Sequence, residues 1–195
     1  MDRAPWKILI LLQIIGLTLS SREYVLDSEN IFTECLNPPP GSKPFNHLVD
    51  ISRFTTKKDK DGIHISGNLT TTWDIGPTDR IEINVAILKL DRGNWKPTAL
   101  AVNVKDFCKE MYDTNTLYYP YSIKYISNKQ DVKDKCFNHK GTLILVDPFV
   151  LKVVLSVAVP LGPGPHRVVV KLVAYNTDGV PNPTSICMEV PGKVV

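Results

Sequence analysis

Apolar and polar residues alternate along most of this chain, and that pattern predicts β-strands. In residues 63–73, Ile63 and Ile65 fall on one face while polar side chains fall on the other. Residues 80–91 alternate in the same way until the parity slips at Leu88, which indicates a β-bulge. Further strands are predicted at residues 24–35, 48–54, 142–146, 149–159, 167–176 and 184–190.

One short helix and several turns complete the pattern. The helix is predicted at residues 104–112, where Val104, Phe107 and Met111 have helical spacing and no Gly or Pro intervenes. A Pro- and Gly-rich segment at residues 160–165 separates two of the strands. About eight or nine short strands with such turns and one small helix predict an all-β fold, a two-sheet β-sandwich.

Residues 1–20 have the form of a secretory signal peptide, with a charged start, an apolar stretch and small residues at its end. The apolar stretch is shorter than the about 20 residues that span a membrane and contains Gln13 and Gly16, so a retained anchor is the weaker interpretation. We therefore expect residues 21–195 to form a single secreted, extracellular domain without stable membrane insertion.

The charge balance argues against a nucleic-acid partner. The chain of 195 residues has 23 Lys and Arg against 20 Asp and Glu. In its densest basic cluster, residues 57–61, the lysines are interrupted by Asp59 and Asp61. This cluster predicts a solvated turn between two strands and not a basic stripe for nucleic acid.

Asn68 begins the only usable N-glycosylation sequon, because Asn182 is followed by Pro183. Alternation places Asn68 on the polar face of its strand. The two observations together predict that Asn68 carries a glycan.

Four cysteines allow three disulfide pairings. Pairing Cys35 with Cys187 ties the two ends of the domain together and leaves Cys108 to pair with Cys136. Behind a secretory leader, disulfides are the expected state of these thiols. No Cys-x-x-Cys and no His pair offers the spacing of a zinc site, so no metal is predicted.

The run from residue 149 to 161 is apolar on both faces except at Lys152 and Ser156. Sandwich strands normally show one face to water. Three explanations stay open: a loop or helix covers the outer face, the run is ordinary buried core, or it lines an internal cavity or its mouth. Lys152 is then either a rim residue that meets a headgroup or an ordinary exposed lysine.

Motifs of catalysis are missing from the sequence. It contains no Gly-x-Ser-x-Gly elbow, no His-Glu-x-x-His and no phosphate loop. The histidines are scattered, at positions 47, 64, 139 and 166. We expect a protein that is not an enzyme and needs no cofactor.

Several short segments occur in a recognisable order: Ala-Ile-Leu-Lys-Leu, Gly-Asn-Trp-Lys, Asp-Phe-Cys-Lys-Glu-Met-Tyr, Gly-Pro-His-Arg and Ser-Ile-Cys-Met-Glu-Val. This order resembles the GM2-activator-like branch of the MD-2-related lipid-recognition (ML) superfamily. The start of the domain, the Phe-Cys segment and the Ile-Cys-Met-Glu ending are most similar to the insect chemosensory CheA/CheB group. The chain has fewer cysteines than the GM2 activator, so ganglioside handling does not carry over.

The resemblance implies a β-sandwich opened into an apolar cup that holds a lipid, a fatty acid or a cuticular hydrocarbon. It implies secretion into the fluid around sensory neurons, with a sensory receptor or channel as a further partner in pheromone or taste detection. It also favours the disulfides Cys35–Cys187 and Cys108–Cys136.

The predicted ligand-binding residues are the inward-facing positions of the doubly apolar run and of the strands expected opposite. They are Phe149, Leu151, Val153 and Leu155, with Ile65, Ile83, Val85, Val168 and Val170 facing them. The competing hypothesis is a secreted interaction module of sandwich fold with a solid core, which acts on a receptor or partner protein through its surface.

Overall fold

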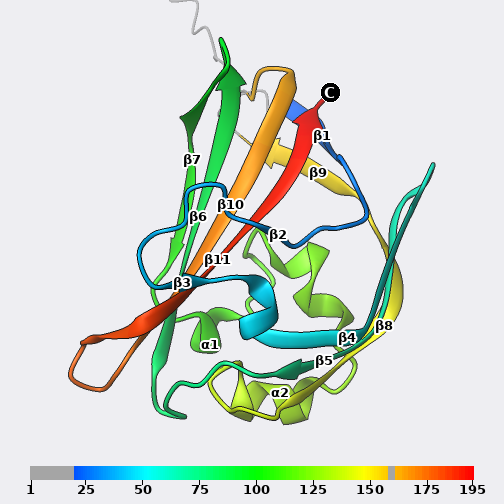
Figure 1. Ribbon diagram of the computed structural model, residues 1–195. Helices are drawn as coiled ribbons and strands as arrows, with labels where there is room; N and C mark the ends of the chain where they lie inside the picture. Colours follow the sequence, from blue (N-terminus) through cyan, green and yellow to red (C-terminus); the bar gives the residue numbers. More distant parts are fainter. Residues whose placement is uncertain (1–19, 158–160) are drawn as a thin grey trace, which may run out of the picture.

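The computed structural model describes residues 20–157 and 161–195. The predicted signal peptide lies outside the described residues except for Ser20. Two sheets, antiparallel except for the short parallel pair of β3 with β11, form the framework of the described chain, so the predicted all-β, two-sheet sandwich is confirmed (Figure 1). No helix in the part of the chain that the structure describes is long and apolar enough to cross a bilayer.

The larger sheet, sheet A, has the strand order β7-β6-β10-β11-β1-β9, and two short strands, β2 and β3, also pair with β11. Its strands are β1 Ser20–Leu26, β2 Thr33–Glu34, β3 Ser42–Lys43, β6 Arg80–Asp91, β7 Asn94–Val104, β9 Val153–Val157, β10 Gly164–Tyr175 and β11 Pro181–Val194. The smaller sheet, sheet B, has the order β4-β5-β8. Its strands are β4 Val49–Asp59, β5 Gly62–Thr71 and β8 Leu143–Leu151.

The β6–β7 hairpin follows the sequence prediction closely. β6 has the predicted bounds, and the register with β7 shifts between Ala86 and Leu88, as the parity slip indicated. The turn between the strands places Arg92 at φ 51° and Gly93 at φ 81°. Two successive left-handed residues match the right-handed twist of the flanking strands, which explains the tight connection.

Two predicted strands are divided in the structure. The predicted strand at residues 24–35 is two strands, β1 and β2, because the chain leaves the sheet after Leu26 and returns at Thr33. The predicted strand at residues 149–159 changes sheets: β8 pairs with β5 up to Leu151, and β9 pairs with β1 from Val153. A continuous apolar run therefore contributes to both layers.

The predicted helix is shorter than expected. Val104 still belongs to β7, where it pairs with Ile83, and α1 covers only Phe107–Glu110 behind the N-cap Asp106. The sequence pattern missed a second helix, α2 Lys129–Lys135, because Val132 is its only buried residue and leaves no apolar periodicity to recognise. Three 3₁₀ turns add to the helical content: η1 Phe45–His47, η2 Tyr119–Tyr121 and η3 Ile123–Tyr125.

A packed core fills one end of the sandwich, and the segment between β7 and β8 supplies its middle. Figure 1 shows the helical segment between the two sheets. Met111 and Val132 of that segment are fully buried, together with Ile81 of sheet A and Val49 of sheet B. We call this cluster, which also contains Ile83, Val104, Ile144, Leu172, Ala174 and Ile186, the packed core.

Both disulfides form with the predicted pairing. Cys35 bonds to Cys187 and holds the segment around β2 against β11. Cys108 bonds to Cys136 and joins the start of α1 to the end of α2. The second disulfide therefore fixes the helical segment that fills the packed core.

Candidate functional site

Apolar side chains that face the space between the sheets are only partly buried in the middle of the sandwich. Sheet A contributes Val85, Ile87, Leu100, Val102, Val168, Val170, Met188 and Val190. Sheet B contributes Phe54, Val146, Phe149 and Leu151. We call these twelve residues the half-buried band.

The change in burial along single strands defines the band. On the inner face of β10, Ala174 and Leu172 are 0% and 3% exposed, Val170 and Val168 are partly buried, and His166 is again 0% exposed. On β11 the inner face passes in the same way from Ile186, fully buried, to Met188 and Val190, partly buried. The band is therefore a less buried stretch of the interior between two buried ends.

The second closed end is a small apolar cluster on the far side of the band. It consists of Tyr24, Leu26, Ile31, Ile63, Ile65, Leu161 and Val194. Tyr24 crosses this end and donates its hydroxyl hydrogen to the Val190 carbonyl at 2.7 Å. Burial raises the pKa of Tyr24 well above its ordinary value, so the hydroxyl stays a hydrogen-bond donor at any physiological pH.

A lysine that the sequence analysis did not single out joins the two sheets at this end. Lys58, near the tip of β4, faces inward beside Ile63. Its ammonium donates to the carbonyl oxygens of Leu26 and Asp27, at 2.6 and 2.9 Å. The predicted solvated turn therefore contains one lysine that connects sheet B to the end of β1.

The nine predicted ligand-binding residues are distributed over both sheets. Sheet A carries Ile83, Val85, Val168 and Val170, and its edge strand β9 carries Val153 and Leu155. Sheet B carries Ile65, Phe149 and Leu151. Ile65 and Phe149 are direct neighbours on β5 and β8, so the expectation that they face each other from opposite sheets is wrong.

Burial separates these nine residues further. Ile83 and Ile65 are buried in the two closed ends. The other seven are partly buried. Among the residues that the prediction omitted, Ile87 continues the alternation of β6, and that signal could have found it.

The outer face of the doubly apolar run is not covered. Val150 and Val154 point away from the interior and are 39% and 41% exposed. Lys152 stands where the chain changes sheets, and its ammonium lies 3.7 Å from a carboxylate oxygen of Glu23. The apolar run thus combines inner residues of the half-buried band with outer residues that face solvent.

Tyr125 adds an aromatic wall that local sequence could not reveal. Its ring stacks on Phe149, with centroids 3.7 Å apart and planes inclined by 6°. Tyr125 comes from η3 in the inserted helical segment, so only the tertiary fold brings it to β8. A partly buried aromatic pair of this kind is a suitable surface for an alkyl chain.

A cavity of about 90 Å³ lies where β8 passes into β9. Its apolar lining includes Leu26, Ile63, Leu151 and Val153, and Lys58 stands at its edge. Pockets for small molecules usually measure about 300–1,000 Å³. An apolar chain of useful length therefore has to spread the partly buried side chains of the band as it enters.

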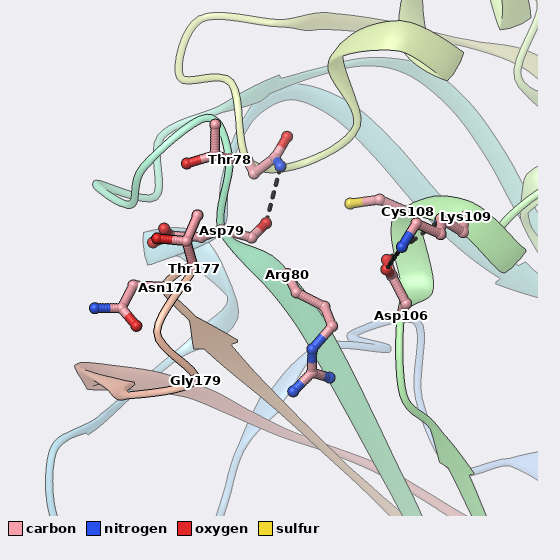
Figure 2. Close-up of a pocket in the computed structure, with 10 residues that line it drawn as sticks. Thr78, Asp79, Arg80, Asp106, Cys108, Lys109, Asn176, Thr177 and Gly179 are labelled. Atoms are coloured by element: carbon pink, nitrogen blue, oxygen red, sulfur yellow. Dashed lines mark hydrogen bonds and ion pairs between the residues drawn. The ribbon is translucent and has the colours of Figure 1, made fainter.

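A larger cavity, of about 410 Å³, has a polar lining and lies away from the band, next to α1 (Figure 2). Its residues are Thr78, Asp79, Arg80, Asp106, Cys108, Lys109, Asn138, Asn176, Thr177 and Gly179. Several of its polar groups already have protein partners. Asn138 donates to the Asp79 carbonyl at 3.0 Å, and Lys109 lies 2.7 Å from Asp106.

The predicted glycosylation site lies on the outer face of sheet B. Asn68 is on β5 opposite Arg53 and Leu145, and it is partly buried. Within residues 20–157 and 161–195, no three His, Cys, Asp or Glu side chains come together to hold a metal ion.

Comparison with models of protein families and with curated proteins finds no match to this chain. The resemblance to the ML superfamily therefore stays a prediction from the residues. The geometry between the two sheets is the basis for a functional proposal.

Proposed function

We propose that this chain is a secreted carrier that binds a lipid, a fatty acid or a long-chain hydrocarbon between its two sheets, at the half-buried band. The observation that carries the proposal is the loss of burial in the middle of β10 and β11, between two ends that are fully buried. Val168 and Val170 face the interior and are nevertheless partly exposed, which is the arrangement that an open apolar binding site between the sheets requires.

The binding energy would come from burying methylene groups. Each one contributes about 0.8 kcal/mol, so ten give a gross gain of about 8 kcal/mol before the costs of binding are subtracted. A dissociation constant in the micromolar range corresponds to about 8 kcal/mol. Because association costs at least about 4 kcal/mol, about five or more further methylenes are needed to bind at this strength without a charged anchor.

The remaining features fit a carrier in an oxidising compartment. Two disulfides connect distant segments, as is common in secreted domains. The leader predicted at residues 1–20 and the resemblance to insect chemosensory proteins favour the fluid around sensory neurons as the setting, with pheromone or taste ligands as the cargo. A sensory receptor or channel is then the partner that receives the ligand.

Fluorescence titration with a long-chain fatty acid that carries a fluorophore tests this proposal. The chain offers a matched pair of variants: Leu151 faces the band, and the adjacent Val150 faces solvent. We expect Leu151→Gln to weaken binding at least about tenfold, because a polar amide then replaces apolar contact. Val150→Gln should bind as the unmodified protein does.

Circular dichroism of both variants shows whether they fold. If the two folded variants bind the fatty acid with equal affinity, the half-buried band is not the binding site. A folded protein that takes up no apolar probe at all contradicts the carrier and leaves the interaction module with a solid core.

A further inference from the structure

His166 stands at the end of the half-buried band with a ring nitrogen that lacks a partner. His166 lies two residues before Val168 on β10 and therefore on the same inner face. Its side chain is completely buried, and Nε2 has no hydrogen-bond partner among the described residues. An unsatisfied buried polar atom is unfavourable and therefore needs an explanation.

The other ring nitrogen fixes which role Nε2 can play. Nδ1 lies 2.8 Å from the carbonyl oxygen of Gly164. A carbonyl oxygen can only accept, so Nδ1 carries the hydrogen of the neutral ring. Nε2 is then an acceptor that points to no donor. The nearby Tyr24 hydroxyl cannot serve it, because its hydrogen is shared between the Val190 and His166 carbonyl oxygens.

Lys89 supplies a donor at the same place. It is directly opposite His166 on β6, where paired residues place their Cβ atoms about 4.5–5.5 Å apart on one face. The Lys89 ammonium lies close to Gly162: a Cβ atom added to this glycine would be 2.7 Å from Nζ. Among the described residues Lys89 forms no ion pair. The end of the band therefore carries an acceptor and a donor on two residues that are direct neighbours across the β6–β10 pair.

We propose that Nε2 of His166 and Nζ of Lys89 bind the terminal hydroxyl of a long-chain alcohol whose alkyl chain lies along Val168 and Val170. A hydroxyl group donates and accepts at one oxygen, and it satisfies both side chains at once. An alkane satisfies neither, and an ether can only accept. This inference rests on the proposed function, because it names the class of ligand that the same site prefers.

Displacement of the apolar dye Nile red by hexadecanol, by its methyl ether and by hexadecane tests the inference on the complete protein. We expect hexadecanol to bind about tenfold more tightly than hexadecane, which corresponds to about one good hydrogen bond. The methyl ether has lost the hydrogen that it would donate to His166 but can still accept from Lys89, so it should bind about threefold more tightly than hexadecane.

Substitutions show which side chains cause the preference for the alcohol over the alkane. His166→Phe keeps an aromatic ring of similar size and should reduce the alcohol-to-alkane ratio to about three, because only the contact with Lys89 remains. His47→Phe, at an exposed histidine on η1, is the control and should keep the ratio at about ten. Lys89→Met, at a partly exposed position, should reduce the ratio about threefold, and it decides the question if His166→Phe does not fold.

The outcomes separate the two proposals. Equal affinity for alcohol and alkane in the unmodified protein overturns the hydroxyl site and leaves the carrier. A preference for alcohol that stays at about tenfold in both His166→Phe and Lys89→Met overturns it as well. Absence of binding by all three ligands overturns the carrier and the hydroxyl site together.

Discussion

The packed core and the half-buried band lie on the same strands, a few residues apart, and they differ in what faces them. Ile83 and Leu172 meet Phe107, Met111 and the rest of the inserted helical segment, and they are buried. Val85 and Val170 are the next inward residues on the same strands and remain partly exposed. The inward-facing residues are equally apolar in both regions.

This difference shows that a third layer closes the core. Two twisted sheets that pack face to face stay about 10 Å apart only where side chains meet across the gap. In the packed core, residues between β7 and β8 fill that gap. Along the band fewer side chains from outside the sheets contribute, mainly Tyr125 against Phe149 and Phe32 against Phe54, and the inward-facing residues stay partly exposed.

The largest expected effect concerns the two disulfides. The chain-entropy argument assigns about 5 kcal/mol to Cys35–Cys187, which spans 152 residues, and about 3.5 kcal/mol to Cys108–Cys136, which spans 28. Urea unfolding of the two double Cys→Ala variants measures both. We expect loss of Cys108–Cys136 to loosen the helical segment and to spare ligand uptake at the band. A larger loss of stability from the shorter loop contradicts the ranking.

Matched isoleucines compare the two regions directly. Ile186 belongs to the packed core and is fully buried, and Ile87 belongs to the band. Ile186→Ala should lower the free energy of unfolding by about 2–5 kcal/mol, and Ile87→Ala by only about 1 kcal/mol, because Ile87 has less surface to lose. Equal losses in urea unfolding would show that the band is as tightly packed as the core.

Substitution of Lys58 tests the hydrogen bonds that connect the two sheets at the far end of the band. Lys58→Met removes two hydrogen bonds from the ammonium to β1 carbonyl oxygens and should lower the free energy of unfolding by about 1–2 kcal/mol. Lys57→Met is the control, because Lys57 is exposed like Lys58 but lies on the other face of β4. Equal free energies of unfolding in the two variants would mean that the hydrogen bonds of Lys58 do not stabilise the fold.

The smallest expected effect is the acid sensitivity of Glu82, on the outer face of sheet A. The hydrogen bond from Asn103, followed by those from Asn84 and Arg80, holds the pKa of Glu82 below its ordinary value of 4.5. A lowered pKa in the folded state stabilises the protein above about pH 4.5, and the gain is lost as the pH falls through the folded value. Glu82→Gln should flatten this decline by less than about 1 kcal/mol.

Thermal unfolding at a series of acidic pH values measures the decline. Ligand affinity should not change in Glu82→Gln, because Glu82 lies outside the space between the sheets. A parallel change in ligand affinity would contradict the separation of outer face and band.

The sequence was sufficient for elements that depend on local pattern. Alternation and a parity slip identify β6, its bulge and its turn, because these features are encoded within a few residues. The same alternation finds Val168 and Val170 on the inner face. It cannot tell a filled core from a gap, because both require apolar residues.

Other features depend on contacts that are distant in the sequence. The change of sheet at Lys152 is hidden because Val150 and Val154 are apolar although they face solvent. Tyr125 and Lys58 reach the band only through the tertiary fold. The role of His166 depends on its burial and on the Gly164 carbonyl, neither of which a scattered histidine reveals.

Methyl NMR with a spin-labelled stearic acid tests the central claim most directly, because the label broadens signals only in its vicinity. The account predicts the strongest broadening at Ile87, Val168 and Val170, and weaker broadening at Ile81 and Ile186 of the packed core. Broadening confined to Val150 and Val154, or no broadening at all, would contradict a chain-binding site between the sheets.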